Sequence, residues 1–239
     1  MKYQIYYNIN NIKYSNTQGR IGDEFSEEIK KIGNSIKLKN IKKLVNIIDK
    51  YPENLSNFTI NEINILLDKQ NKRDAKIYYQ ILKEAYEIDD TFKKYMLNNN
   101  VDEEIINKVY DTIPKIIYKI DLALYVVKKF YDRVRPSILS KELLKHNIID
   151  DSIKPWIKLP THPAYPSGHA TQSMFLAEYF SNYYPQYRQC FENAAEEISV
   201  NREIAGLHYR SDTIAGYKLG KFLAIEYLKN NQTTFGLFD

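Results

Sequence analysis

The sequence has almost no cysteine: Cys190 is the only one in 239 residues. A single cysteine cannot form a disulfide within the chain or supply a cysteine metal cluster. The sequence therefore gives no sign of an oxidising compartment or of a cysteine-based metal site. Because Cys190 lies in a helical pattern, we expect it to fill space and not to act as a nucleophile.

Long apolar runs are also missing. No stretch of about 18 apolar residues occurs, which excludes a transmembrane helix from this sequence. The first residues are polar and lack the apolar segment of a secretory signal. We therefore expect a cytoplasmic or otherwise intracellular protein.

An excess of charge of one sign is absent as well. The formal net charge is +4, from 34 basic and 30 acidic residues, and the basic residues form no long block. This pattern predicts no nucleic-acid partner. The 44% hydrophobic and 27% charged residues are typical of a globular protein. A homo-oligomer stays open, because nothing in the sequence decides the oligomeric state.

Strand signals are scarce, whereas apolar residues recur at helical spacing through most of the chain. We expect an all-α fold, a compact single-domain helical bundle over residues 1–239 with about seven to nine helices. Residues 1–25 are interpreted as an irregular lead-in, and 26–100 as a helical part without recognisable motifs. Residues 115–229 would form the helical core that carries the candidate site.

Turn and capping residues divide the pattern into segments. Thr59 with Glu62 predicts a capping box, and Pro114 predicts a helix start. A proline-rich loop is expected at 148–167. We expect helices at about 27–49, 59–67, 77–96, 103–110, 115–134, 168–182, 185–205 and 212–229.

One stretch stands out, the turn Ala164-Tyr165-Pro166-Ser167-Gly168-His169-Ala170. It leads into a predicted helix, whose free N–H groups and positive dipole end favour an anion such as phosphate. Ser167 and His169 add a hydroxyl group and an imidazole to the same concavity. By itself the turn is a weak signal, because Pro-Ser-Gly is common turn chemistry.

A second motif lies upstream, at Lys128 and Arg135. The two residues are seven positions apart, almost two helical turns, so we expect both side chains on one helix face. Both could reach one anion, the lysine as a point charge and the arginine through two oxygens. Lys129 and Arg133 are interpreted as solvated side chains near a helix C-terminus.

A third motif lies downstream, at Arg202, His208 and Asp212. A carboxylate four residues after an imidazole can accept its Nδ1–H and leave a lone pair on Nε2. That is the arrangement of an activated histidine nucleophile. Asp212 could also cap the next helix, and the two roles are compatible.

Taken in order, Lys-x6-Arg-Pro, Pro-Ser-Gly-His and Arg-x5-His-x3-Asp closely resemble the signature of the type 2 phosphatidic acid phosphatase (PAP2) superfamily. That superfamily includes class A nonspecific acid phosphatases, lipid phosphatases and vanadium-dependent haloperoxidases. The match covers about residues 128–212, and the chain looks most like the class A acid phosphatases. One position departs: the family usually has serine before the third-motif arginine, and here it is Asn201. We expect altered positioning of Arg202 more than lost activity.

The resemblance implies a metal-independent phosphatase that hydrolyses phosphomonoesters. Its partner would be a phosphorylated small molecule or a lipid headgroup. Lys128, Arg135 and Arg202 would clamp the phosphate oxygens, while Ser167 and the Gly168 N–H complete the cradle. Three cations already neutralise the phosphoryl group, so no metal and no other cofactor is expected.

The resemblance also gives the histidines separate roles. His208, oriented by Asp212, would attack phosphorus and form a phosphohistidine. His169 would protonate the leaving alkoxide and then activate water. The remaining histidines, His146 and His162, are assigned surface or loop roles.

Two other functions stay open. A vanadium-dependent haloperoxidase would hold vanadate as its cofactor in the same pocket, bonded to His208. A noncatalytic phosphate-binding module would keep the fold without turnover, and Asn201 is the only hint of it in the sequence.

Overall fold

The fold is given by a computed structural model that describes residues 2–17, 25–35, 38–85 and 87–230. In these ranges every regular element is a helix and there is no strand, so the expected all-α fold is confirmed. No helix within them is both long enough and apolar enough to cross a membrane.

The helices in chain order are α1 (Lys2–Asn10), α2 (Tyr14–Thr17), α3 (Glu27–Ser35), α4 (Leu38–Val45), α5 (Asn57–Asn71), α6 (Ala75–Glu84), α7 (Asp89–Asn98), α8 (Glu103–Tyr131), α9 (Pro136–Lys145), α10 (Gly168–Tyr183), the 3-10 helix η1 (Pro185–Tyr187), α11 (Arg188–Ile204) and α12 (Arg210–Lys229). These are more helices than expected. The difference arises because several expected helices are split and α9 was not anticipated.

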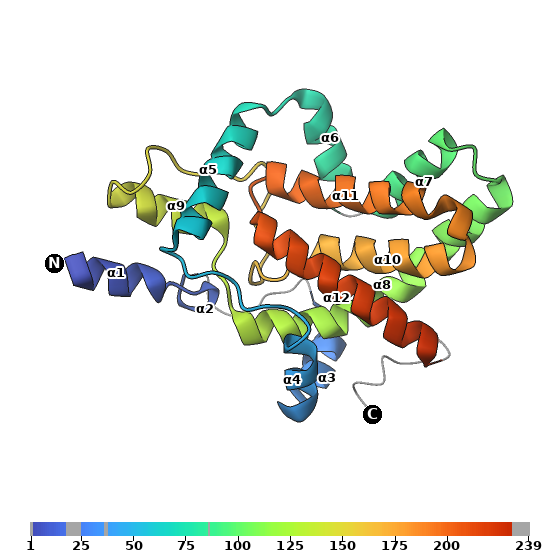
Figure 1. Cartoon of the computed structure of the whole chain (residues 1–239), viewed down its shortest axis with the longest axis horizontal. Coiled ribbons are helices and arrows are strands. Elements are labelled where there is room, and N and C mark those ends of the chain that lie inside the picture. The colour runs from blue at the N-terminus through green and yellow to red at the C-terminus, as the bar shows by residue number, and fades with distance from the viewer. Residues whose placement is uncertain (1, 18–24, 36–37, 86, 231–239) are drawn as a thin grey trace.

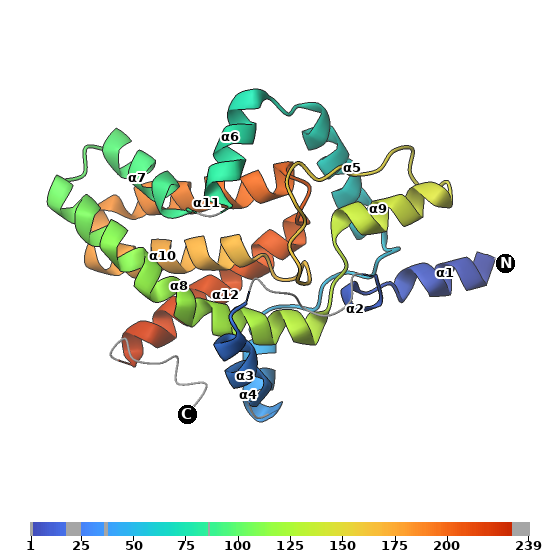
Figure 2. The ribbon, with the colours of Figure 1, turned by 180° about the vertical axis from the view of Figure 1, so that it is seen from behind.

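Helix α10 is the centre of the bundle. It packs against α8, α11 and α12, as both ribbon views show (Figures 1 and 2). A helix enclosed on several sides has to be apolar around most of its circumference. The fully or nearly fully buried apolar residues of α10 are Ala170, Met174, Phe175, Leu176, Ala177 and Phe180.

Two glycines bring α12 unusually close to α10. A Cβ atom on Gly220 would lie 2.5 Å from the carbonyl oxygen of Thr171, and one on Gly216 would lie 2.8 Å from that of Ser167. Any larger residue would push the helices apart. The close approach lets the Ser167 N–H donate to the Asp212 carbonyl oxygen at 3.0 Å. In this way the packing joins the turn before α10 to the motif that contains Asp212.

Helix α8 runs through Pro114 without a break, although the sequence predicted separate helices at 103–110 and 115–134. A proline inside a helix costs about 3 kcal/mol. Burial on both sides of the proline offsets that cost, because the apolar residues keep one helical spacing across it. The buried side chains are Ile106, Val109, Ile113, Ile116, Ile120, Leu124 and Val127.

The N-terminal part departs further from expectation. The expected irregular lead-in at 1–25 contains α1 and α2, and its residues 18–24 lie outside the described part. The expected helix at 27–49 consists of α3 and α4. The positions between these two helices, 36–37, also lie outside the described part.

The cap of α5 was assigned to the wrong residue. Ser56 caps this helix, and its Oγ accepts the Thr59 N–H at 3.1 Å. Both residues are favourable caps, so the sequence alone could not choose between them. Glu62 does not close a capping box and lies buried beside Arg133 instead.

The expected helix at 77–96 is divided into α6 and α7, which both pack on α11. No proline or glycine marks the division in the sequence. Each half buries its own apolar residues, Ile81 in α6 and Phe92 and Met96 in α7. The division leaves the C-terminus of α6 pointing at the candidate site.

Candidate active site

The three motifs meet around one cavity of about 800 Å³. Five of the eight predicted site residues line it: Lys128, Gly168, His169, Arg202 and His208. The other three, Arg135, Ser167 and Asp212, are fully buried and support this lining from behind.

Arg135 does not reach the site in the expected way. Helix α8 ends at Tyr131 because Asp132 adopts a left-handed conformation with φ of 51°. Arg135 has an extended backbone and forms the N-cap of α9. The prediction that Lys128 and Arg135 project from one helix face was therefore wrong, although both side chains do lie at the site.

The Arg135 guanidinium group is held by several acceptors. Nη1 donates to the Leu207 carbonyl oxygen at 2.9 Å and lies 3.1 Å from Nε2 of His208. Nη2 donates to the His162 carbonyl oxygen at 2.9 Å and lies 3.1 Å from Nδ1 of that residue. A guanidinium group can only donate, so Nε2 of His208 must accept.

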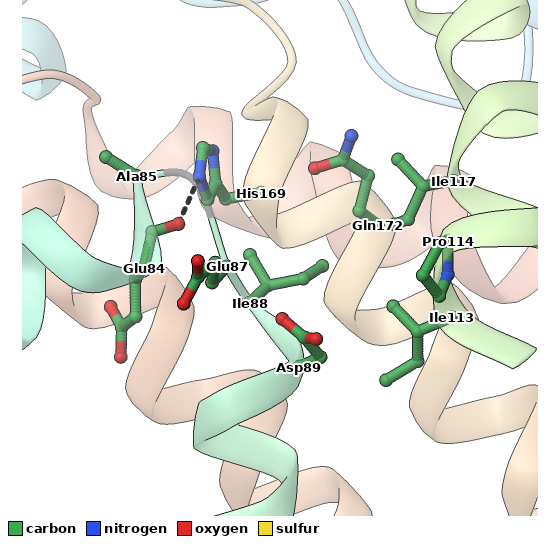
Figure 3. A pocket seen from close by; sticks show the side chains of 10 residues that line it. All are labelled: Glu84, Ala85, Glu87, Ile88, Asp89, Ile113, Pro114, Ile117, His169 and Gln172. Carbon is green, nitrogen blue, oxygen red and sulfur yellow. Dashed lines mark hydrogen bonds between the residues drawn. The ribbon is translucent and has the colours of Figure 1, made fainter. Parts of the chain in front are cut away.

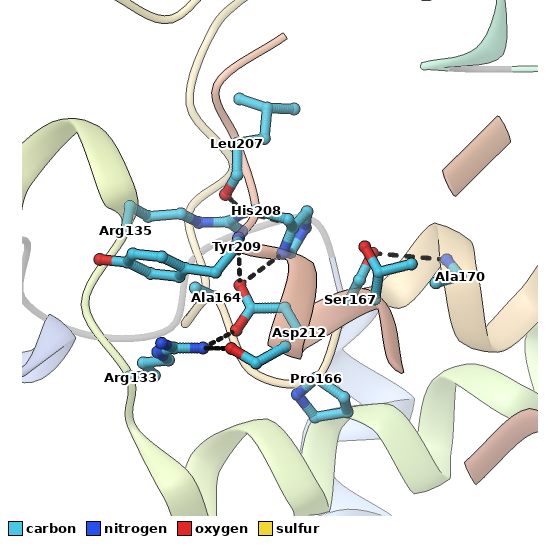
Figure 4. Close-up of polar contacts among 12 residues, drawn as sticks. Arg133, Arg135, Ala164, Pro166, Ser167, Ala170, Leu207, His208, Tyr209 and Asp212 are labelled. Carbon is cyan, nitrogen blue, oxygen red and sulfur yellow. Dashed lines mark hydrogen bonds and ion pairs between the residues drawn. The ribbon is translucent and has the colours of Figure 1, made fainter. Parts of the chain in front are cut away.

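The other ring nitrogen of His208 faces Asp212, as Figure 4 shows. Nδ1 of His208 lies 3.2 Å from Oδ2 of Asp212, which also accepts the Tyr209 N–H at 3.0 Å. The expected contact between His208 and Asp212 is therefore present. With a carboxylate at Nδ1 and a donor at Nε2, the neutral imidazole carries its proton on Nδ1.

Besides His208, Asp212 has a cationic neighbour that the sequence did not reveal. Arg133 pairs with Oδ1 of Asp212 (Figure 4). It also donates to Oγ of Ser211 at 2.8 Å. Only 1% of the Arg133 side chain is exposed, and its guanidinium group lies 3.8 Å from the Tyr209 ring centroid. The interpretation of Arg133 as a solvated side chain was wrong. Arg133 therefore pairs with the Asp212 carboxylate on the side away from His208.

Lys128 supports the turn before α10. Its buried ammonium group donates to the carbonyl oxygens of Pro163 at 2.8 Å and Pro166 at 2.6 Å. These contacts fix the loop next to Ser167, while the side chain still lines the cavity. Ser167 caps α10, and its Oγ lies 3.4 Å from the Ala170 nitrogen.

Arg202 has donors available for an anion. Its Nη2 donates to the Ile81 carbonyl oxygen at 2.8 Å and lies 3.2 Å from Oε2 of Glu84. Its Nε and Nη1 are buried and have no hydrogen-bond partner among the described residues. Buried donors without acceptors are costly, so this side chain suits an oxyanion such as phosphate or vanadate.

Comparison with known proteins gives the family. The PAP2 superfamily model matches residues 116–235, half of the chain and all three motifs. The chain belongs to the PAP2 superfamily.

Curated relatives match over shorter stretches. A vanadium-dependent bromoperoxidase from Ascophyllum nodosum is 33% identical over 105 residues, which cover 32% of this chain and 19% of the relative. A lipid A 1-phosphatase from Rhizobium johnstonii is 34% identical over 62 residues, which cover 26% of this chain and 25% of the relative. The chain thus spans no more than a quarter of the length of either protein.

A solved structure shares the fold. The crystal structure of a bacterial vanadium-dependent iodoperoxidase superposes with a TM-score of 0.53 and 20% sequence identity. The superposition covers 77% of this chain and 51% of that one. At this identity the likeness concerns the PAP2 fold alone.

The residue that departs from the usual PAP2 pattern has a clear structural task. Nδ2 of Asn201 lies 3.0 Å from both carboxylate oxygens of Glu84, which is fully buried. Glu84 in turn pairs with Arg202. Asn201 thus positions Arg202 through Glu84, a residue of α6 that carries no family motif and that the sequence analysis missed.

His169 is held by the same residue through its main chain. Nε2 of His169 lies 3.0 Å from the Glu84 carbonyl oxygen, at the end of α6 (Figure 3). A carbonyl can only accept, so Nε2 carries a proton and Nδ1 is the nitrogen left for proton transfer. Burial, together with the Arg202 charge, lowers the pKa of His169 to about 3.

His162 also belongs to the site, contrary to expectation. It lines the cavity and contacts Arg135 through both its ring and its carbonyl oxygen. No pattern in the sequence indicates this role, because His162 lies in a loop without periodic spacing. His146 lies away from the cavity and pairs with Glu142.

No group of three or more histidine, cysteine, aspartate or glutamate residues that could hold a metal ion occurs in the part of the chain that the structure describes. Cys190 is buried, in agreement with its expected packing role.

Proposed function

We propose that this PAP2 protein is a phosphatase that hydrolyses phosphomonoesters through a phosphohistidine intermediate. One observation carries the proposal. His208 keeps its proton on Nδ1 beside Asp212 and a lone pair on Nε2, and Arg202 in the same cavity has two buried nitrogens, Nε and Nη1, without a hydrogen-bond partner among the described residues. A nucleophile and an oxyanion site would thus share one cavity.

In the first step Nε2 of His208 attacks phosphorus and the bond to the leaving oxygen breaks. Arg202 and Arg135 donate to the phosphoryl oxygens as charge develops. A monoanionic substrate supplies the proton, which passes through Nδ1 of His169 to the leaving oxygen, so that the alcohol departs neutral.

In the second step His169 acts as a base. Its neutral Nδ1 takes a proton from water, and the water oxygen attacks the phosphoryl group on His208. The N–P bond breaks, the proton on Nδ1 of His169 passes to the departing inorganic phosphate, and both imidazoles return to their neutral starting forms. Asp212 stabilises the positive charge that His208 carries while it is phosphorylated.

Charge compensation in the proposal comes from the protein itself. Lys128, Arg135 and Arg202 surround the phosphoryl position with three cations, so we propose that turnover needs no metal ion. Activity on p-nitrophenyl phosphate should persist in EDTA. Loss in EDTA with recovery in magnesium or zinc would contradict this part of the proposal.

The decisive experiment separates the two histidines. His208→Ala should abolish turnover of every ester, whereas His169→Ala should accumulate labelled phosphoenzyme with the activated ester p-nitrophenyl phosphate, which needs little protonation to depart. Rapid quenching into alkali followed by mass mapping places the label. His146→Ala, outside the cavity, is the matched control and should behave as wild type. A label on a residue other than His208 would overturn the mechanism.

Haloperoxidase activity is the second candidate, favoured by the bromoperoxidase relative. Vanadate is an oxyanion of similar shape, and His208, Arg135 and Arg202 would hold it; when bound it supplies peroxide-dependent halide oxidation. Halide oxidation after loading with vanadate and peroxide, measured beside phosphate release, separates the two activities. Phosphate binding with neither activity would instead indicate a noncatalytic phosphate-binding module.

A further inference from the structure

The cavity does not end at the phosphate position. Because His169 would protonate the leaving oxygen, the leaving group must lie on the His169 side of the site. Gln172, one helical turn after His169 on α10, lines the cavity there together with Asp121 from α8. These side chains would contact the part of the substrate that departs.

Asp121 is an unusual residue for an anion-binding cavity. Its carboxylate accepts a hydrogen bond from Nε2 of Gln172 at 2.8 Å and forms no ion pair with a described residue. Burial raises the pKa of Asp121 to about 6. A carboxylate in this position is ionised at neutral pH without a cation to balance it.

A second pocket of about 440 Å³, whose lining side chains Figure 3 shows, shares residues with the cavity. His169 and Gln172 line both spaces. The carboxylates of Glu87 and Asp89 border the second pocket, and none of its described lining residues is lysine or arginine. Cations of the motifs therefore line the cavity, whereas carboxylates border the pocket that shares His169 and Gln172 with it.

We propose that the preferred substrate is a phosphomonoester whose leaving group carries an ammonium group, which binds at Asp121 and Gln172. This inference rests on the proposed phosphatase function and specifies its substrate class. An ammonium group gives Asp121 the cationic partner that no described residue supplies, and the Gln172 side-chain oxygen can accept a second hydrogen bond.

Helix geometry limits the length of the leaving group. Gln172 follows Gly168 by four residues, about 6 Å along α10. Asp121 precedes Lys128 by seven residues, about 10 Å along α8. A short aminoalkyl chain spans the space between a phosphate at the start of α10 and these two side chains.

The test compares aminoethyl phosphate with propyl phosphate, which has the same number of heavy atoms and no charge on its leaving group. Wild type should show a kcat/KM about tenfold higher for the amine, as expected for one charged hydrogen bond. Asp121→Asn keeps the size and the acceptor for Gln172 but removes the charge, and should abolish most of that preference. Asp111→Asn removes the same charge from an exposed position of α8 and should leave the preference intact.

Binding of phosphonates separates this inference from the proposed function. Aminoethylphosphonate should bind about tenfold tighter than propylphosphonate in calorimetry, with the difference lost in Asp121→Asn. If no phosphomonoester is hydrolysed but this difference is found, the proposed function fails and the ammonium site stands. Equal affinities, or a preference that survives Asp121→Asn, would overturn the ammonium site.

Discussion

Nη1 of Arg135 lies 3.1 Å from Nε2 of His208, so the proposed nucleophile already accepts a hydrogen bond from a cation that would bind the phosphate. The contact fixes the tautomer of His208 before substrate arrives. In the proposed mechanism, the Arg135 N–H that donates to Nε2 of His208 would have to donate to a phosphoryl oxygen instead as the N–P bond forms. Arg135 thereby couples activation of the nucleophile to stabilisation of charge.

The first prediction concerns this coupling. Arg135→Lys keeps the charge but cannot serve His208, the Leu207 carbonyl oxygen and a phosphoryl oxygen from one planar group. We expect kcat on p-nitrophenyl phosphate to fall about a hundredfold, the effect of losing one transition-state donor. Steady-state kinetics beside Lys129→Arg, an exposed change near the end of α8, tests this. A kcat within twofold of wild type would contradict the assigned role.

The second prediction concerns the Asp212 carboxylate. Asp212→Asn removes the charge that faces both His208 and Arg133, and its amide could donate to Nδ1 and reverse the tautomer. We expect kcat to fall about a thousandfold or more. Because Arg133 stays buried beside only Glu62, unfolding should also become easier by about 3 kcal/mol. Circular dichroism below the melting transition shows whether the loss of activity occurs in folded protein.

The third prediction concerns pH. The pKa of His169 is lowered to about 3 by burial and the Arg202 charge, and burial with the Arg135 charge holds the pKa of His208 well below its usual value. Both imidazoles of the free enzyme are therefore neutral from mildly acidic pH upward. The proton for the leaving group has to arrive with a monoanionic substrate, whose second pKa is about 6.

It follows that kcat/KM for an alkyl phosphate should decline as pH rises through about 6, because the substrate loses its proton. As pH falls through about 6.5, kcat/KM should not decline, because neither histidine gains a proton there. A pH profile of kcat/KM, which reports the free enzyme and free substrate, measures this. An acidic limb close to 6.5 would mean that His208 titrates with an ordinary pKa.

The fourth prediction concerns the departure from the usual family pattern. Asn201→Ala removes two hydrogen bonds from Glu84 and leaves Arg202 less firmly oriented. Because Arg202 would grip phosphate in the ground state as well as in the transition state, we expect KM to rise about tenfold with a smaller change in kcat. Asn193→Ala, exposed on the same helix α11, is the control. A kcat loss without any KM change would place Asn201 in another role.

The candidate site could be predicted from the sequence where its contacts are local. His208 and Asp212 stand four residues apart, so their contact needs only the start of one helix. The N-terminus of α10 follows from the capping preference of Ser167 and the apolar pattern behind it. The helical content follows for the same reason, since apolar spacing reports which face of each segment is buried.

Other features were decided only by tertiary packing. Glu84 meets Asn201 across 117 positions of the chain, and no local pattern indicates that α6 ends over the site. Arginine is usually a surface residue, but Arg133 is buried because Asp212 from α12 and Glu62 from α5 both pair with it. Pro114 predicts a helix start, yet the core on both sides of it keeps α8 continuous.

The sequence by itself determined the helical class, the three PAP2 motifs and the pairing of His208 with Asp212, because each depends on residues within a turn or two of one another. Only the tertiary structure decided how Arg135 reaches His208, which carboxylate pairs with Arg202, and that Asp121 lines the same cavity as His169. These contacts join segments whose approach depends on helix packing, such as the glycine contacts of α12 against α10, and on where each helix ends.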